Sequence, residues 1–358
     1  MRGAVPPPDG QRPPTRLAAA TVPLQAGTSA SDARLVFITN LQPTLDDRIR
    51  GVFLQRQIGD VAAMLRTPPR IVHVGGRGAG GLLASRRAVR AAIRELRPDV
   101  LHIVYGLSGA AVPFGLDVPA VLTLCGSDLL WGPTTGHPRG LLEYVVSVIT
   151  ACRAQRITVE SAVLRDALPS ASLRARTIIL PPGVDRATFR PLPRSECRAR
   201  LGWPVDEGVV LFPANPSRTL KRYGLALAAV SELDTGRGDR IVLRAMTRVP
   251  PGEVPLYLNA ADCVIITSAW EGGPLAFYEA LACGTPVVSV PVGYARDQTW
   301  RTPYVRVTVP TPVALRAELI DVFRNPVPHE CPADVIIPDP VEYASRLLAV
   351  YQQVLDGA

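Results

Sequence analysis

Lys221 is the single lysine of the chain, and every other basic side chain among its 39 lysine and arginine residues is an arginine. It lies in a short loop between an apolar run at 208–212 and a helical pattern at 223–233. Lys221 and the nearby Arg218 could neutralise a diphosphate there, because the lysine ammonium is a compact charge and the helix start adds its dipole. A solvated lysine at a helix start is the alternative interpretation.

Two glutamates separated by seven residues follow in the next part of the chain. Glu271 stands in a loop after the strand predicted at 263–267, and Glu279 lies one turn into the helix predicted at 275–283. Gly273 and its neighbours allow a sharp turn and a close approach to a ligand. The two carboxylates therefore flank the free N–H groups of a helix start, where a phosphate binds. Without a ligand, the same acids fit a first helical turn and a surface loop.

The segment that holds both glutamates, residues 257–297, resembles the donor-binding signature of the retaining glycosyltransferases of family 4. Glutamates with this separation are the hallmark of that family. Similarity to the family extends from Arg34 to the C-terminus, in the segments 50–57, 98–102, 119–128 and 181–191. The resemblance implies the α/β fold called GT-B, in which two doubly wound, Rossmann-like domains face each other across a cleft.

The resemblance also implies roles for the residues that match the donor-binding signature. Glu279 would bind the ribose of the nucleotide, and Glu271 would contact hydroxyl groups of the transferred sugar. Arg218 and Lys221 would neutralise the diphosphate. The backbone amides that would hold phosphate oxygens are those of Leu275 and Ala276, with Gly273 beside them.

The first half of the chain contributes further candidates by the same resemblance. Gly51 would lie near the phosphate and the acceptor. Asp128 follows a glycine-serine turn, where it could be a helix N-cap or an acceptor contact. The family usually has histidine at the position of Cys125, and a cysteine does not offer the same hydrogen bond to a donor sugar. An arginine of the family is replaced by Pro216, so Arg218 stands closer to the lysine than usual.

The implied reaction is transfer of a sugar from a nucleoside diphosphate sugar to an acceptor hydroxyl, with retention of the anomeric configuration. No metal or other cofactor is expected, because basic side chains neutralise the leaving diphosphate. The candidate acceptor-binding loops, 41–50 and 130–140, contain no pattern that identifies the acceptor. It could be a small molecule, a glycan or a lipid-linked compound. Alternatives that use the same cleft are a sugar-nucleotide epimerase, a phosphorylase and a catalytically inactive sugar-nucleotide-binding protein.

Composition narrows the classes of function. A net charge of +8 fits a nucleotide ligand or an anionic membrane surface, although codon bias also explains the preference for arginine over lysine. Nucleic-acid binding is not expected, because the arginines are scattered and aromatic residues make up 6% of the chain. None of the six cysteines forms a Cys-x-x-Cys pair, and the four histidines are dispersed, so the sequence contains no pattern that predicts a zinc site.

The same cysteine usage, with no convincing signal peptide and no apolar span, predicts a cytoplasmic enzyme of carbohydrate biosynthesis, with peripheral contact at the inner face of the membrane left open.

A length of 358 residues and an alternation of short apolar runs with longer amphipathic ones predict two domains of βα units. The predicted strands are 34–39, 70–74, 100–105, 120–124, 156–159, 177–180, 209–212, 240–243, 263–267, 287–290 and 305–309. The predicted helices are 51–65, 85–96, 141–153, 222–233, 256–259, 275–283, 313–323 and 341–355. The carboxyl ends of both sheets would face one cleft.

The predicted boundaries are a disordered tail at 1–32, an acceptor-side domain at 33–185, a donor-binding domain at 186–340 and a terminal helix at 341–358 that the resemblance places against the first domain. The glycine-rich segment 75–81 lacks the spacing of a P-loop or a dinucleotide turn and is interpreted as a flexible surface loop. His102, at the end of a predicted strand, could be a core histidine or a site residue.

Overall fold

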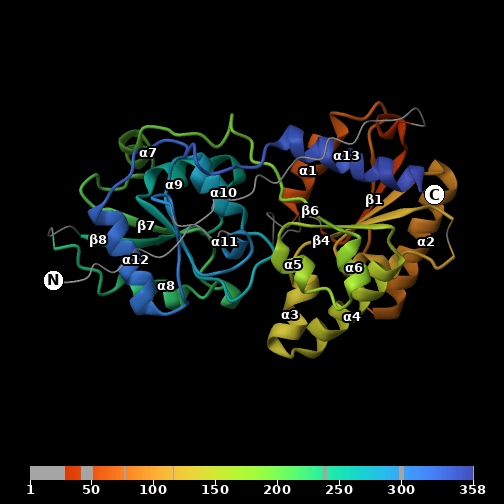
Figure 1. The fold of residues 1–358 in the computed structure, drawn as a ribbon, viewed down its shortest axis with the longest axis horizontal. Helices are drawn as coiled ribbons and strands as arrows, with labels where there is room; N and C mark the ends of the chain where they lie inside the picture. The colour runs from red at the N-terminus through yellow and green to blue at the C-terminus, as the bar shows by residue number, and fades with distance from the viewer. Residues whose placement is uncertain are drawn as a thin grey trace, which may run out of the picture.

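The chain forms two α/β domains that lie side by side in a computed structural model (Figure 1). The structure describes residues 29–357 apart from 42–50, 76–77, 116, 237–239 and 298–301. Most of the first candidate acceptor loop and most of the predicted tail therefore lie outside the described residues. Residues 30–32, which the tail prediction included, instead form a short 3-10 helix, because the backbone N–H of Ala30 donates to Oε1 of Gln352 at 2.8 Å.

The first domain is built on a six-stranded parallel sheet with the order β2-β1-β3-β4-β5-β6. Its strands are β1 Leu35–Thr39, β2 Arg70–His73, β3 Val100–Val104, β4 Ala120–Leu124, β5 Arg156–Val159 and β6 Thr177–Ile179. The helices between them are η1 Ala30–Asp32, α1 Val52–Ala62, α2 Gly78–Leu96, η2 Gly106–Ala111, α3 Ser127–Thr135, α4 Pro138–Arg153, α5 Ala162–Asp166 and α6 Ala171–Ala175. The central strands β1, β3 and β4 are buried throughout, as continuous apolar runs in a two-sided parallel sheet require.

The second domain has a five-stranded parallel sheet with the order β11-β10-β9-β7-β8. Its strands are β7 Gly208–Phe212, β8 Ile241–Ala245, β9 Cys263–Ile266, β10 Val287–Ser289 and β11 Val305–Val307. Its helices are α7 Arg194–Leu201, η3 Thr219–Lys221, α8 Tyr223–Val230, η4 Pro251–Glu253, α9 Val254–Ala260, α10 Leu275–Ala282, α11 Tyr294–Asp297 and α12 Pro312–Arg324. In both domains the chain reverses its direction of winding beside the first strand, which is where open α/β sheets bind ligands.

The last helix, α13 (Pro340–Asp356), returns to the first domain and packs beside α1 (Figure 1). Alternate residues of β1 belong to two separate hydrophobic cores. Leu35 and Phe37 pack with α1 and α13, whereas Val36 and Ile38 pack on the opposite face of the sheet. Gly183 lies directly against the backbone of Pro340, so a side chain at residue 183 would collide with the start of α13. The terminal helix therefore completes the hydrophobic core of the first domain.

His102 is a core histidine that ties β3 to α13. Its Nδ1 lies 2.6 Å from the hydroxyl of Tyr351, and its Nε2 lies 2.6 Å from Oγ1 of Thr123. Burial lowers the pKa of His102 to about 3. The imidazole is therefore neutral in the folded protein and holds a structural position away from the interdomain contact.

His102→Gln is expected to flatten the pH dependence of folding. The folded pKa lies below the ordinary 6.5, so the unfolded chain takes up a proton first. Stability is then lost as pH falls below about 6.5, by roughly 1.4 kcal/mol per pH unit. Urea unfolding between pH 7.5 and about 5.5 should show a steeper slope in the native chain and in Tyr351→Phe than in His102→Gln, where only His329 keeps a lowered histidine pKa among the described residues. An unchanged slope in His102→Gln would contradict the assignment.

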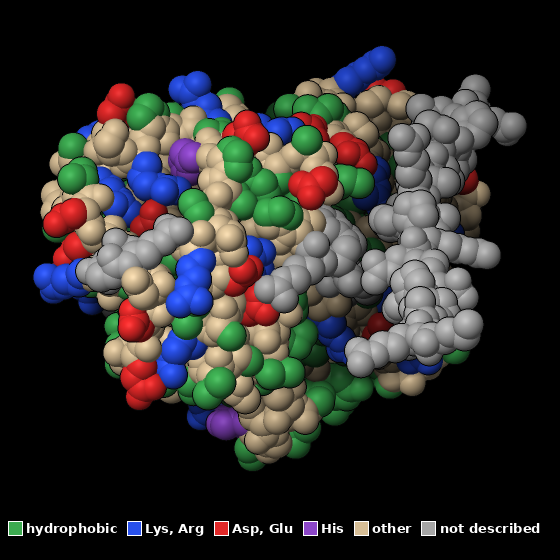
Figure 2. Space-filling model, turned by 60° about the vertical axis from the view of Figure 1, so that its left-hand side comes forward, with side chains coloured by type: hydrophobic (Ala, Val, Ile, Leu, Met, Phe, Trp, Pro, Cys, Tyr) green, Lys and Arg blue, Asp and Glu red, His purple; other side chains and the backbone are tan. Residues whose placement is uncertain are grey.

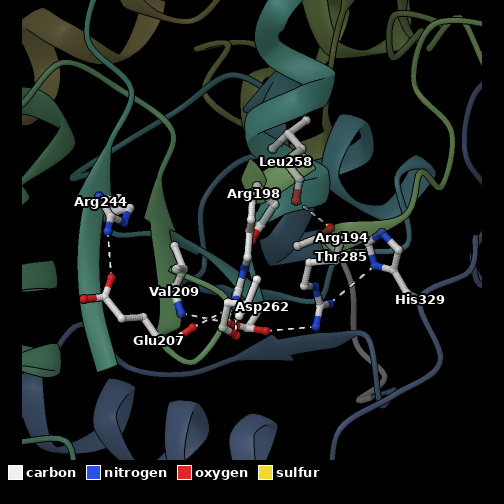
Figure 3. A network of polar contacts seen from close by, with 11 residues as sticks. Arg194, Arg198, Glu207, Val209, Arg244, Leu258, Asp262, Thr285 and His329 are labelled. Atoms are coloured by element: carbon white, nitrogen blue, oxygen red, sulfur yellow. Dashed lines mark hydrogen bonds and ion pairs between the residues drawn. The ribbon is translucent and has the colours of Figure 1, made fainter. Parts of the chain in front are cut away.

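A polar network fastens α7 to the second sheet at the amino ends of its strands (Figure 3). Asp262 accepts hydrogen bonds from the backbone of Val209 at 2.7 Å, from Arg198 at 2.6 Å and from Arg194 at 2.8 Å. These contacts lie at the opposite edge of the sheet from the loops that carry Lys221 and Glu271, so the network is structural.

The exposed charges of the molecule are of mixed sign on the face drawn in Figure 2. Lys and Arg side chains alternate there with Asp and Glu side chains over the described surface, and no broad basic patch forms on that face. Nucleic-acid binding, which requires a basic face or stripe, gains no support from it.

Two sequence predictions about local structure were wrong. Residues 78–81 of the glycine-rich segment are the first turn of α2, not a surface loop, because the helix already established at 85–96 extends toward its N-terminus. The predicted acceptor loop 130–140 is mostly helical, because it holds the end of α3 and the start of α4. Helices α3 and α7, and the shorter helices α5, α6 and α11, were not predicted. The interior proline of α3 and the strongly polar composition of α7 conceal their helical pattern.

Candidate functional site

The loops that follow β7 and β9 meet at the predicted diphosphate position. The ammonium group of Lys221 pairs with Oε1 of Glu271, and the hydroxyl of Ser268 donates to the same oxygen at 2.6 Å. The side chains of Lys221 and Glu271 are only 18% and 14% exposed, so neither is a freely solvated surface charge. The structure therefore brings together two residues that lie fifty positions apart in the sequence.

Arg222 holds these two loops against each other, and sequence reasoning missed it. Its backbone is left-handed, with φ of 52°, and its guanidinium donates to the carbonyl oxygens of Thr267 at 2.6 Å and Ser268 at 2.7 Å. Thr267 in turn donates to the carbonyl of Lys221 at 2.8 Å. A positive φ at a non-glycine residue is a strained position that neighbouring contacts must hold, and these contacts fix the direction of Lys221. Arg218, by contrast, is exposed at the start of η3, and its predicted diphosphate role stays a prediction.

The turn after Glu271 lies directly against the first domain. A β-carbon added at Gly272 would stand 2.7 Å from the carbonyl oxygen of Cys125 and 2.9 Å from Leu164. The hydroxyl of Ser161, which follows β5, donates to the carbonyl of Gly272 at 2.5 Å. Only glycine fits at residue 272, because two backbone segments approach each other there. The loop that carries Glu271 is therefore part of the contact between the domains.

Gly272→Ala should lower the free energy of unfolding by about 1–3 kcal/mol or force the domains apart, since the added methyl group has no space. The matched control is Gly59→Ala in α1, where an added β-carbon meets nothing within 4 Å. That change should raise stability by about 0.5–1 kcal/mol through helix propensity. Denaturant unfolding together with small-angle scattering separates loss of stability from domain opening. Equal behaviour of the two variants would rule out the tight contact.

Glu279 faces the first domain from the first turns of α10. Its Oε1 pairs with Arg56 of α1 at 3.3 Å, and its side chain is 13% exposed. Burial raises the pKa of the Glu279 carboxyl, and the charge of Arg56 opposes that shift. Glu279, Arg56 and Leu275 line a small cavity between the two domains, together with Phe53 and Gln57 of α1. Sequence reasoning missed Arg56, although it lies in the segment 50–57 that resembles the family.

The predicted phosphate-binding amides lie beside this cavity. Leu275 and Ala276 are the first two residues of α10, and no side chain caps the helix at Pro274. The first N–H groups of the helix are thus left for another partner. Gly273 stands just before them, over the hydroxyl of Tyr294. In the first domain, Gly51 is the N-cap residue of α1 with φ of 73°, a conformation that favours glycine.

The first-domain candidates Asp128 and Cys125 lie beneath the surface of the cleft rather than on it. Asp128 is fully buried and accepts hydrogen bonds from the backbone of Gly106 at 3.0 Å, Cys125 at 3.1 Å and Gly126 at 2.8 Å. Sequence analysis left Asp128 open between a helix N-cap and an acceptor contact; Gly126 is the N-cap residue of α3, and the oxygens of Asp128 are used to fold the loop. Cys125 is half-buried and packs beside the core under α1 and α13, and its predicted place near the sugar stays a prediction.

Glu160 is a further acid at the domain contact that sequence reasoning did not select. It follows β5 directly and is 7% exposed. Burial raises the pKa of Glu160 well above its ordinary value, and the negative charges of Glu271 and Asp128 raise it further. A charged residue immediately after a buried strand, next to Ser161, was the signal in the sequence that could have identified it.

Two further observations concern metals and membranes. Within the described ranges, no three His, Cys, Asp or Glu side chains are grouped as metal ligands. No helix among the described residues combines the length and apolar character that a membrane span requires.

Two family models match the chain, one in each domain. The model described as Glycosyltransferase Family 4 matches residues 36–188, and the model described as Glycosyl transferases group 1 matches residues 242–301, the region of Glu271 and Glu279. Each domain of the chain is therefore similar to a glycosyltransferase family, the first to family 4 and the second to group 1.

Curated relatives resemble part of this chain. A D-inositol 3-phosphate glycosyltransferase of Kineococcus radiotolerans is 33% identical over 34% of this chain and 36% of its own length. A D-inositol 3-phosphate glycosyltransferase of Catenulispora acidiphila is 30% identical over 54% of this chain and 56% of its own length. The matched regions thus span between about a third and just over half of these curated relatives.

Solved structures share the fold at low sequence identity. Sucrose-phosphate synthase from Thermosynechococcus elongatus has a TM-score of 0.66 at 16% identity, covering 91% of this chain and 94% of that one. Anabaena Alr3699/HepE in complex with UDP-glucose has a TM-score of 0.63 at 16% identity, covering 91% and 99%. These GT-B neighbours confirm the predicted fold of two doubly wound domains.

Proposed function

We propose that this protein transfers a sugar from a nucleoside diphosphate sugar to an acceptor hydroxyl, with retention of the anomeric configuration. The observation that carries the proposal is the meeting of Lys221 and Glu271 beside the uncapped start of α10, at the contact between the two domains. A positive side chain and free helix N–H groups suit a diphosphate, and buried carboxylates suit sugar hydroxyls.

The chemistry follows from where charge develops. Breaking the anomeric C–O bond leaves negative charge on the diphosphate and positive charge on the sugar ring. Lys221 and the amides of Leu275 and Ala276 stabilise the diphosphate as it leaves, and Glu271 orients the sugar. Because these groups are already held in position, little reorganisation is required during the reaction. In the proposed retaining mechanism, the departing phosphate oxygen takes the proton of the acceptor hydroxyl.

Glu279 binds the ribose hydroxyls in this proposal, and Arg56 stands opposite it across the cavity. Arg218 supplies further positive charge when the diphosphate is bound. No metal is required, since the charge of the leaving group is met by side chains and a helix start. Several structural neighbours were solved with UDP, UDP-glucose or ADP, which supports a nucleotide-sugar donor.

The acceptor proposed for the first experiments is a phosphorylated polyol. Curated relatives are named D-inositol 3-phosphate glycosyltransferases, and the chain carries a net charge of +8, which favours an anionic acceptor.

The test begins with thermal stabilisation by a panel of nucleotide sugars, because a ligand that binds the folded state raises the melting temperature. The donor that binds is then incubated with inositol phosphates and simple glycosides in the presence of EDTA. The anomeric configuration of the product is determined by proton NMR. An inverted product would exclude retention, and loss of turnover in EDTA would exclude the metal-free mechanism. Binding without any turnover over a broad acceptor panel would favour an inactive sugar-nucleotide-binding protein.

A further inference from the structure

Helix α4 presents an apolar face to solvent. The stripe formed by Leu141, Leu142, Val145 and Ile149 has exposed fractions of 43%, 62%, 50% and 46%. The residues recur at intervals of three and four positions, so they lie along one side of the helix. A surface helix of this kind normally turns such residues toward the core.

The buried face of α4 has the opposite character. Its buried residues are Gly140, Ser147, Thr150 and Ala151, which are small or polar. They allow close packing: Gly140 fits against Gly132 of α3, and Thr150 fits against Gly109 of η2. The hydroxyls of Ser147 and Thr150 donate hydrogen bonds to backbone carbonyls, at 2.7 and 2.9 Å. The helix is therefore anchored without the apolar stripe, which remains available to a partner.

An exposed aromatic residue extends the apolar surface at the end of α4. Phe114 is 69% exposed, and the guanidinium of Arg153 lies 4.1 Å from the centre of its ring. Arg153 also donates to the carbonyl of Val112 at 3.2 Å, which fixes it on the segment after η2. An aromatic ring beside an arginine is a combination suited to the boundary between an apolar and a polar phase.

Helix α2 adds a row of positive charge next to this surface. Leu83, Arg87, Arg90 and Arg94 are exposed and lie on one side of the helix, and Glu95 is the acid near its end. Helices α2 and α4 both pack on η2, where Arg86 donates to the carbonyl of Ala110 at 3.0 Å. Figure 1 shows α4 on the side of the first sheet opposite α1 and α13.

We propose that the stripe of α4 and the arginine row of α2 form one docking surface for an anionic lipid bilayer. Burial of the stripe in the interfacial region supplies the apolar contribution, and the arginine row supplies attraction to anionic headgroups. The charge row argues against a second copy of this chain as the occupant, since two like-charged rows would repel each other in a symmetric dimer. A nucleic acid would use the arginines but gain nothing from an exposed stripe of leucine, valine and isoleucine.

The position of the surface links docking to the interdomain cleft. Helix α3 begins at Ser127, directly after the Cys125–Gly126 turn that touches Gly272, and α3 and α4 pack together as a hairpin. A bilayer that receives α4 would therefore lie on the side of the first domain that also carries the candidate acceptor segment 130–140, which spans the end of α3 and the start of α4.

Flotation of the full chain with vesicles tests the surface without relying on enzymatic activity. The vesicles are phosphatidylcholine alone or an equal mixture of phosphatidylcholine and phosphatidylglycerol. We expect binding to the anionic vesicles that weakens steeply as salt rises from about 0.1 to 0.5 M, because screening shortens the reach of the arginine charges. Two double variants should each reduce binding about tenfold or more. One is Leu142→Asp with Ile149→Asp in the stripe, and the other is Arg87→Glu with Arg90→Glu in the arginine row.

The matched control is Val313→Asp, which changes an apolar residue of α12 that is 72% exposed in the second domain. It should bind anionic vesicles like the native chain. All substituted positions are at the surface, and unchanged melting temperatures verify the fold. Equal binding to neutral vesicles, or full binding by either double variant, would overturn the proposal. Light scattering provides a further test. If the native chain is a dimer and the double variant Leu142→Asp with Ile149→Asp is a monomer, the stripe is an interface between copies and the proposal is overturned.

Discussion

Lys221→Ala is expected to reduce turnover about 10²- to 10³-fold while the protein remains folded. This is the usual cost of removing one prepositioned charge from a site where negative charge develops. Lys221 is mostly buried and pairs with Glu271, which Ser268 also holds, so the acid keeps one partner when the lysine is removed. Steady-state kinetics with the donor found by thermal stabilisation gives the measurement.

Arg218→Ala provides the comparison for Lys221→Ala. Arg218 is exposed at the start of the same short helix, so its removal should cost less than the removal of the buried lysine. Lys221→Arg keeps the charge but not the compact shape of the ammonium group, and should restore only part of the activity. Turnover of Lys221→Ala at the native rate would remove this residue from the reaction.

Glu279→Ala is expected to weaken binding of the free nucleoside diphosphate about 10- to 100-fold, because hydrogen bonds to a charged group contribute about 1.5–3 kcal/mol. Burial raises the pKa of Glu279, and Arg56 lowers it. Binding that requires the carboxylate should therefore weaken as pH falls through this raised pKa, at a higher pH than for an exposed glutamate. Isothermal titration over a series of pH values measures both effects.

Arg56→Met separates ribose binding from domain contact. Arg56 pairs with Glu279 across the two domains, so either variant breaks that ion pair. If Glu279 contacts the ribose, Glu279→Ala loses affinity and its pH dependence, whereas Arg56→Met retains the carboxylate and binds nucleotide with much smaller loss. Identical losses in the two variants would mean that Glu279 acts only through the ion pair.

Glu160 and Tyr294 show how a buried site can escape sequence reasoning. The hydroxyl of Tyr294 is buried and has no hydrogen-bond partner within the described part of the chain, and Glu160 is the acid with the next-largest effect on its pKa after burial. Glu160 follows β5 and Tyr294 begins the short helix α11, and neither segment is unusual when considered alone. Their proximity depends on the contact between Ser161 and Gly272, which no local pattern encodes.

The sequence alone was sufficient for the strands of both sheets and for the turn that carries the two predicted donor-side glutamates. Parallel strands buried on both faces have to be continuous apolar runs, so all eleven predicted strands differ from those observed by no more than two residues at either end, as at Ala120–Leu124 and Arg156–Val159. Glycine and proline mark the turn between β9 and α10. The sequence therefore correctly placed Glu271 in the loop before α10 and Glu279 within that helix. These features are local, because each depends on the order of neighbouring residues.

Only the tertiary structure decided which side chains are used up in folding and which remain for a ligand. The role of Asp128 was open between a helix N-cap and an acceptor contact until its oxygens were found on three backbone amides. Arg222 was not selected until it was seen to hold the loop after β9. Arg56 meets Glu279, and the stripe of α4 faces outward, only because helices distant in sequence pack at particular angles. Hydrogen-bond satisfaction and burial are properties of three-dimensional neighbours, and a linear pattern does not contain them.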